Sequence, residues 1–134
     1  MGPWLVSWFR KKQRFIALSI VEVEYVAIAS CCTQLLWMMQ TLHDIQIKCS
    51  PPISILCDNT SAISISKNFV MHSKTKHIPI KYHILWEQVL EKKVKLEYVT
   101  SKEQVVDIFT KPLPREVFEY LRQKLGVVSV SFWC

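Results

Sequence analysis

Three acidic positions stand beside the ends of expected helices and strands, where carboxylates could bind a metal ion. Asp58 directly follows the short apolar run 53–57, and either Glu22 or Glu24 lies at the start of the longest helical pattern. Asp107 falls early in the helix expected after the last strand. Carboxylates gathered from separate elements at one end of a sheet suit Mg²⁺, a hard cation that takes oxygen ligands. Two such ions could align a water molecule and stabilise the leaving oxygen of a phosphodiester.

A simpler interpretation stays open for each acid. Asp58 could merely cap the helix that follows it, because an N-cap aspartate accepts a hydrogen bond from a helix amide. The other acids could be solvated surface residues that favour a helix start electrostatically. On a helical wheel Glu22 and Glu24 lie on opposite sides of the stripe formed by Tyr25, Ile28 and Cys32, so only one of them can face a common pocket.

The elements that must position these acids follow from hydrophobic spacing and turn residues. The run 53–57 lies between two prolines and Asp-Asn-Thr-Ser, which predicts a buried central strand. Apolar residues three and four apart predict a long helix from Glu22 to about His43. The remaining pattern predicts a strand or strand pair over 4–18, helices over 60–67 and 78–92, a strand over 94–99, a helix capped by a box at 100–103, and a helix over 114–125 that ends at Gly126. This order predicts one α/β sandwich.

Composition narrows the class of protein. The chain has 134 residues, half of them hydrophobic, which fits one small folded domain. The net charge of +6 favours a polyanionic partner. Five cysteines without a C-x-x-C pair or a secretory leader predict reduced thiols in the cytoplasm or nucleus, and no membrane segment is expected. Trp8, Trp37 and Trp86 each sit in an apolar run and are expected in the core.

A series of short motifs, in order from about residue 6 to residue 127, resembles the ribonuclease H domain that closes the polyprotein of copia-type LTR retrotransposons. The motifs are Val6-Ser7-Trp8 with Lys11-Lys12-Gln13, Ala17-Leu18-Ser19, Glu22-x-Glu24-Tyr25, Cys57-Asp58-Asn59 with Ser61-Ala62-Ile63, His72-Ser73-x-Thr75-Lys76-His77-Ile78, Tyr82-His83, Leu96-Glu97-Tyr98-Val99, and Asp107-Ile108-Phe109-Thr110-Lys111-Pro112-Leu113-Pro114. Several motifs in order are far more specific than a single one.

The resemblance implies a ribonuclease H-like mixed sheet with flanking helices. Four acids of that family bind two divalent ions, Mg²⁺ or Mn²⁺, and the enzyme hydrolyses the RNA strand of an RNA/DNA hybrid. By position, the family's metal ligands and catalytic acids fall on Glu24, Asp58 and Asp107. The implied partners are an RNA/DNA hybrid or another nucleic acid, together with the rest of a retroelement polyprotein.

Departures from the family pattern predict an N-terminally truncated fragment. The family domain begins two strands earlier with a further metal-binding aspartate, whereas no acid precedes Glu22 here. Activity of the chain alone is therefore expected to be weak or absent. Ile20 and Val21 replace the residues that cap the long helix in the family, so a poorly capped start is expected. The predicted domain covers 1–127, and the apolar tail 128–134 lies outside the resemblance.

Two other outcomes stay open beside the nuclease. The chain could be a non-catalytic basic module that binds nucleic acid, or an unfolded, aggregating remnant. Basic residues expected to contact phosphates are Lys11, Lys12, Lys74, Lys76 and His77.

Overall fold

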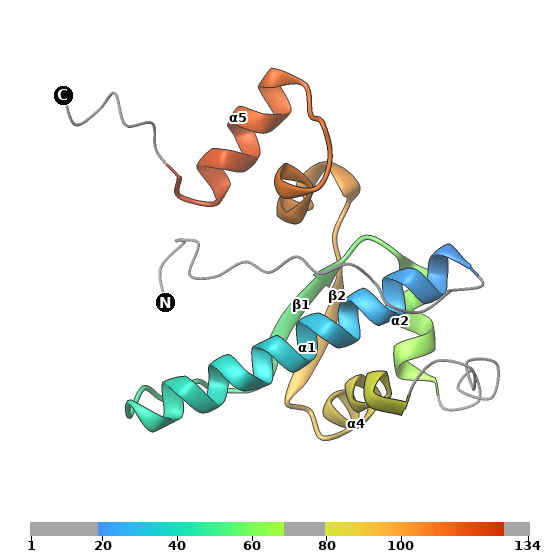
Figure 1. Ribbon diagram of the computed structural model, residues 1–134, viewed down its shortest axis with the longest axis vertical. Helices are drawn as coiled ribbons and strands as arrows, with labels where there is room; N and C mark the ends of the chain where they lie inside the picture. The colour runs from blue at the N-terminus through green and yellow to red at the C-terminus, as the bar shows by residue number, and fades with distance from the viewer. Residues whose placement is uncertain (1–18, 69–79, 128–134) are drawn as a thin grey trace. The chain divides into compact units, whose positions relative to one another are not determined.

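The computed structural model describes residues 19–68 and 80–127 (Figure 1). The chain divides into two compact units, one formed by 15–98 and the other by 1–14 with 99–134. The strand expected over 4–18, Trp8 and the tail 128–134 lie outside the described residues. The boundary between domain and tail at residue 127 therefore stays a prediction.

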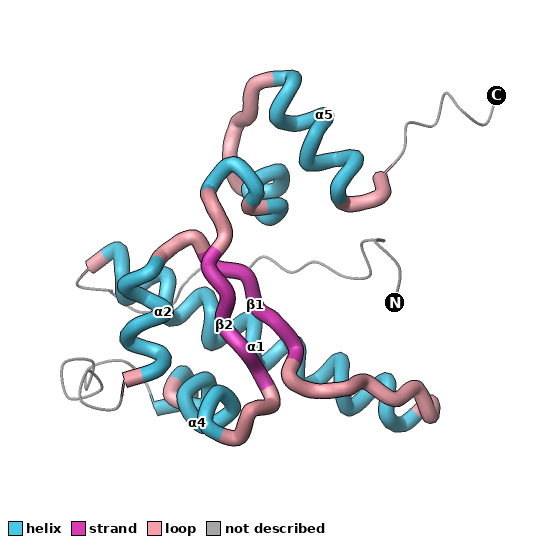
Figure 2. The backbone as a smooth tube through the Cα atoms, turned by 180° about the vertical axis from the view of Figure 1, so that it is seen from behind, coloured by secondary structure: helices cyan, strands magenta, loops and turns pink. Residues whose placement is uncertain are grey.

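The unit 15–98 is built on two parallel strands. β1 (Ile53–Cys57) pairs with β2 (Val94–Tyr98) in a register that places Ile53 beside Val94 and Cys57 beside Tyr98. Parallel neighbours need a crossover connection, and here it contains α2 (Thr60–Lys67), the 3-10 turn η2 (Ile80–Tyr82) and α4 (Ile84–Leu90). The long helix α1 (Ile20–Asp44) crosses one face of the strand pair, as Figures 1 and 2 show from opposite sides. The described residues thus form an α/β fold with a small parallel sheet.

The strands present one face to the core of this unit. In β1, Ile55 and Cys57 are buried, whereas Ser54 and Leu56 are exposed. This alternation corrects the expectation of a buried central strand, because helices cover only one face of the described two-stranded sheet. The core contains Tyr25, Val26, Ile28, Ala29, Cys32, Ile55, Cys57, Ala62, Ile63, Ile65, Leu85, Val94 and Leu96.

The start of α1 is better capped than the sequence predicted. The helix begins at Ile20, two residues before the expected start, and the Ser19 side chain accepts a hydrogen bond from the Glu22 amide at 3.3 Å. The expectation of a poorly capped start was wrong because it aligned the cap with positions 20 and 21. Serine at position 19 satisfies an amide that the first turn leaves without an intrahelical partner.

The exposed part of α1 also differs from the prediction. By length and composition alone α1 could cross a membrane, a property that the core helices of many proteins share. Its buried residues lie between Glu22 and Cys32 and include most of the core contributed by this helix. Trp37 in the second half is 63% exposed, which contradicts its expected place in the core. The apolar residues around Trp37 in the sequence predicted burial. The described part of the chain, however, does not cover this side of α1.

The end of α1 is a Schellman motif with an unusual residue at its turning point. The Gln46 amide donates to the His43 carbonyl at 2.9 Å, and the Ile47 amide donates to the Leu42 carbonyl at 2.8 Å. Gln46 has a φ of 64°, in the left-handed region where glycine is normally found. A side chain with a Cβ atom is strained there by about 1 kcal/mol.

Gln46→Gly is therefore expected to raise the free energy of unfolding by about 0.5 to 1 kcal/mol, since glycine relieves this strain. Urea denaturation followed by circular dichroism measures the change. The control is Gln40→Gly within α1, where glycine should destabilise by about 1 kcal/mol because it lowers helix propensity. A loss of stability in Gln46→Gly would contradict the assigned helix end.

The helix expected over 78–92 is shorter and interrupted. Its start near 78 lies outside the described residues, and the described part is a 3-10 turn followed by α4, which ends at Leu90. The Tyr25 hydroxyl donates to the Tyr82 carbonyl at 3.3 Å, while the Trp86 amide bonds to the His83 carbonyl at 3.1 Å. Burial raises the pKa of Tyr25 to about 12, so its hydroxyl keeps its proton at neutral pH. In a continuous α-helix the Tyr82 carbonyl would accept a hydrogen bond from the Trp86 amide. Here it accepts one from Tyr25 of α1.

The second unit, described over 99–127, is helical. It contains two 3-10 segments, η3 (Ser101–Glu103) and η4 (Val105–Phe109), and the helix α5 (Arg115–Lys124). The capping box expected at 100–103 was wrong, because Thr100 makes no side-chain cap bond and Gln104 is extended with a ψ of 99°, which separates the two turns. Gly126, with a φ of 71°, ends α5 as predicted.

Candidate metal centre

Three potential metal ligands meet at the carboxyl end of β1. Glu24 of α1, Cys57 at the end of β1 and Asp58 directly after it each offer one ligand atom, and these atoms all lie within 4.8 Å of one another. All three belong to the unit 15–98. The two strands run parallel, so this end of β1 is also the carboxyl end of the sheet, where open α/β sheets commonly bind ligands.

The helix pairs Glu24, rather than Glu22, with Asp58. Glu22 is buried, with 8% of its surface exposed, but it is not a member of the ligand group among the described residues. Two residues along a helix are turned by about 200°, so side chains at positions 22 and 24 point in nearly opposite directions. The same angular separation was the reason to expect only one of the two glutamates at the site. Glu24 is the one that lies beside Asp58.

Asp58 is not the cap of α2. The Asn59 side chain accepts the hydrogen bond from the Ala62 amide at 3.0 Å and occupies the N-cap position of that helix. The simpler interpretation of Asp58 as a helix cap is therefore wrong. Because Asn59 performs the capping, the carboxylate of Asp58 can lie beside Glu24 at the end of β1.

Cys57 is the member of the group that the sequence did not predict. The residue is buried at 3% exposure, and its Sγ atom accepts from the Asn59 amide at 3.3 Å and donates to the Asn59 carbonyl at 3.6 Å. Burial raises the pKa of this thiol, the Asn59 hydrogen bond lowers it, and the charges of Glu24 and Asp58 raise it further. The signal in the sequence was its place immediately before Asp58, at the buried end of the strand.

Asp107 lies in the other compact unit, the one that includes residues 99–127. It is buried at 7% exposure, and its Oδ2 atom is 3.0 Å from the Nζ atom of Lys111, one helical turn later. An ionised carboxylate offers only acceptor oxygens, which are the ligands that Mg²⁺ prefers, and one of these oxygens is paired with Lys111 here. Its membership in a common site with Glu24 and Asp58 stays a prediction.

The donor set suits a divalent cation. Two carboxylates from separate elements can each supply one oxygen to Mg²⁺, which usually keeps several waters and needs only one or two protein carboxylates. Cys57 is a soft donor that Mg²⁺ does not need. The carboxylates of Glu24 and Asp58 therefore fit a magnesium ion with water as its other ligands.

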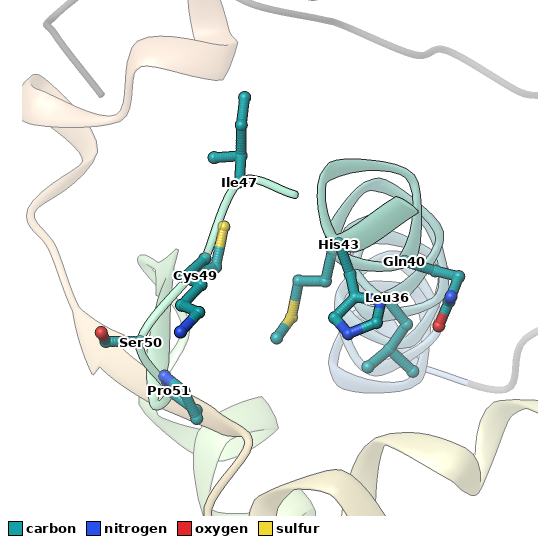
Figure 3. Close-up of a pocket in the computed structure, with 9 residues that line it drawn as sticks. Leu36, Gln40, His43, Ile47, Cys49, Ser50 and Pro51 are labelled. Atoms are coloured by element: carbon teal, nitrogen blue, oxygen red, sulfur yellow. The ribbon is translucent and has the colours of Figure 1, made fainter. Parts of the chain in front are cut away.

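A hollow of about 630 Å³ lies elsewhere in the same unit (Figure 3). It is bounded by the last turns of α1 and by the segment that leads to β1, and its lining includes Leu36, His43, Ile47, Cys49 and Pro51. None of the three ligand residues lines it. The hollow is mostly apolar and is separate from the candidate metal centre.

All the residues predicted to contact phosphates lie outside the described residues; they are Lys11, Lys12, Lys74, Lys76 and His77. The described cysteines, Cys31, Cys32, Cys49 and Cys57, are free, and their reduced state in the cell stays a prediction.

The fold and this centre define an α/β unit that gathers acids at the carboxyl end of parallel strands, and comparison with known proteins narrows the class. The chain is similar to retrovirus-related Pol polyproteins from transposons. It is 35% identical to that of transposon RE2 of Arabidopsis thaliana over all 134 residues, 35% identical to that of RE1 of the same plant over 97% of the chain, and 33% identical to that of TNT 1-94 of Nicotiana tabacum over 92% of the chain.

The chain spans only 9% of the length of each of these curated relatives. No protein-family model matches the sequence, and no solved structure is significantly similar to the fold. The similarity extends along nearly the whole chain and confirms the retrotransposon part of the sequence resemblance. It supports the interpretation that the chain is related to a fragment of a retrotransposon Pol polyprotein.

Proposed function

We propose that the chain is a retroelement-derived, ribonuclease H-like domain in which Glu24 and Asp58 hold a divalent cation for hydrolysis of the RNA strand of an RNA/DNA hybrid. The observation that carries the proposal is the meeting of these two carboxylates at the carboxyl end of β1. Mg²⁺ is the expected ion, with Mn²⁺ as an alternative of similar ligand preference.

The chemistry that such an ion supplies, when bound, is stabilisation of charge on the phosphodiester. Glu24, on the second turn of α1, and Asp58, between β1 and α2, would hold the ion. Sites on helices and strands hold ligands more firmly than sites on mobile loops. Asp107 is proposed as a third ligand, and its ion pair with Lys111 would have to adjust when it binds the ion.

The net charge and the relatives support a nucleic acid as the proposed partner. The net charge of +6 favours a polyanion, and the similar proteins are parts of retroelement polyproteins. Lys11, Lys12, Lys74, Lys76 and His77 are proposed to contact the phosphate backbone, and the rest of a polyprotein is proposed as a protein partner. Activity of the 134-residue chain by itself is expected to be weak, since it offers three of the family's four acids.

The test is cleavage of a labelled RNA/DNA hybrid by the purified chain in Mg²⁺ and in Mn²⁺. Asp58→Asn should lower the cleavage rate by about 100-fold or more, because removing a ligand removes several kcal/mol of charge stabilisation. Asp44→Asn is the matched control: it makes the same chemical change at an exposed position at the end of α1 and should leave the rate unchanged.

Equal cleavage by the parent chain and Asp58→Asn would overturn the assignment of the metal centre. A folded parent chain that binds the hybrid without cleaving it in either ion would instead favour the non-catalytic binding module. Binding of that kind should not need a divalent ion and should weaken steeply as salt rises.

A further inference from the structure

We infer that Glu24, Cys57 and Asp58 together form a mixed oxygen and sulfur site for a thiophilic divalent cation of the Zn²⁺ and Cd²⁺ class. The inference rests on the proposed function only in using the same two carboxylates. It adds a third ligand, Cys57, and a consequence: a thiophilic ion competes with Mg²⁺ for this centre and inhibits the magnesium-dependent reaction.

The geometry brings three potential protein ligands together. The ligand atoms of the three residues lie within 4.8 Å of one another, and each residue comes from a defined helix, strand or strand end. Zinc takes oxygen and sulfur ligands at about 2.0 to 2.3 Å, so two ligands of a tetrahedral ion are about 3.5 Å apart. A pair of ligand atoms at the 4.8 Å limit would have to approach by about 1 Å. Glu24 is only partly buried and has a long side chain, so it can supply this movement.

The type of donor determines which ion gains from Cys57. Mg²⁺ prefers oxygen ligands and would leave the sulfur outside its coordination shell, whereas Zn²⁺ and Cd²⁺ form strong bonds with thiolate sulfur. Two carboxylates alone would discriminate weakly among divalent ions. A sulfur atom in the same group shifts the preference toward the softer ion, because only that ion uses all three ligands.

Without a cation, burial and the charges of Glu24 and Asp58 favour the thiol form of Cys57, whereas a bound divalent cation favours the thiolate. The Asn59 amide donates to Sγ at 3.3 Å, and this bond would remain and strengthen when the sulfur carries negative charge. The weaker bond from Sγ to the Asn59 carbonyl, at 3.6 Å, would be lost with the thiol proton. Cys57 also belongs to the hydrophobic core, so the strand holds its sulfur in place beside the carboxylates.

The other described thiols have different surroundings. Cys31 is exposed on α1, Cys32 is buried beside it in the core, and Cys49 is partly buried at the hollow near the end of that helix. None of the three is grouped with two other potential ligands among the described residues. Cys31 and Cys49 therefore serve as matched controls for the loss of one thiol.

The experiment titrates the full chain with Cd²⁺ under reducing conditions and follows the ultraviolet absorption of the cadmium–thiolate bond. We expect saturable absorption for one ion per chain, loss of that absorption in Cys57→Ser, and no loss in Cys31→Ser or Cys49→Ser. Asp58→Asn should weaken Cd²⁺ binding at least tenfold, which tests the same site without removing the thiol. The Asp44→Asn control should bind Cd²⁺ like the parent chain.

An absorption that persists in Cys57→Ser, or that disappears in Cys31→Ser or Cys49→Ser, would overturn the inference. Absence of cadmium–thiolate absorption from the folded parent chain would overturn it as well. None of these readouts depends on hybrid cleavage, so failure of the proposed nuclease activity is distinguishable from failure of the thiophilic site. Should the parent chain cleave hybrids, Zn²⁺ should inhibit it, and Cys57→Ser should relieve that inhibition.

Discussion

Leu85→Ala is expected to lower the free energy of unfolding by about 3 kcal/mol, the largest stability effect anticipated for the unit 15–98. Leu85 of α4 is completely buried and belongs to the core formed with α1, α2 and the strands. Truncation to alanine removes apolar contacts and leaves a cavity that well-packed neighbours fill only in part. Chemical denaturation, followed by circular dichroism, measures the change.

The matched control lies on the same helix. Leu90 ends α4 and is 58% exposed, so Leu90→Ala removes the same atoms from a position that contributes little burial. We expect a change of about 0.5 kcal/mol or less for this control. Similar losses in the two variants would contradict the placement of α4, because they would mean that both leucines are buried or that neither is.

The second large effect concerns cation affinity. Glu24→Gln and Asp58→Asn are each expected to lower the affinity for Mg²⁺ at least tenfold, since each removes one charged oxygen ligand. The double variant should lose little more than either single variant, because both carboxylates hold the same ion and one of them alone binds weakly. The free-energy changes caused by substituting two residues that bind the same ion are not additive.

Isothermal titration calorimetry of the four proteins in this cycle measures the coupling between the two carboxylates. Asp44→Asn again provides the control, as an acid on α1 that is not a member of the ligand group among the described residues. Strictly additive losses in the double variant would contradict the expected coupling between the two carboxylates. The measurement does not require nuclease activity, so it tests the metal centre separately from the reaction.

Local sequence signals predicted several elements closely. The strand 53–57 and the helix 60–67 have the expected bounds, and the second strand ends one residue early, at Tyr98. Gly126 ends α5 because a left-handed residue closes the Schellman motif and glycine has no Cβ atom to oppose it. These features depend on short-range spacing and turn chemistry, which the sequence displays directly.

The ends of α1 and α4 were predicted within one and two residues and are observed at Asp44 and Leu90. The left-handed residues that follow them, Gln46 and Lys92, are not glycine, so the sequence did not mark these two turning points. The 3-10 turn before α4 accepts a hydrogen bond at the Tyr82 carbonyl from Tyr25, which is 57 residues away in sequence. Such contacts change a local preference through tertiary packing, and no short window of sequence contains both partners.

The candidate metal centre likewise depends partly on local sequence and partly on tertiary packing. The sequence by itself determined that acids stand at the end of β1 and near the start of α1, since strand ends, helix starts and charge are local properties. Only the tertiary structure decided that Glu24 meets Asp58, that Asn59 takes over the capping role, and that Cys57 joins the group. The physical reason is that packing of α1 on the sheet brings together residues more than 30 positions apart, and their distances depend on that packing rather than on their spacing along the chain.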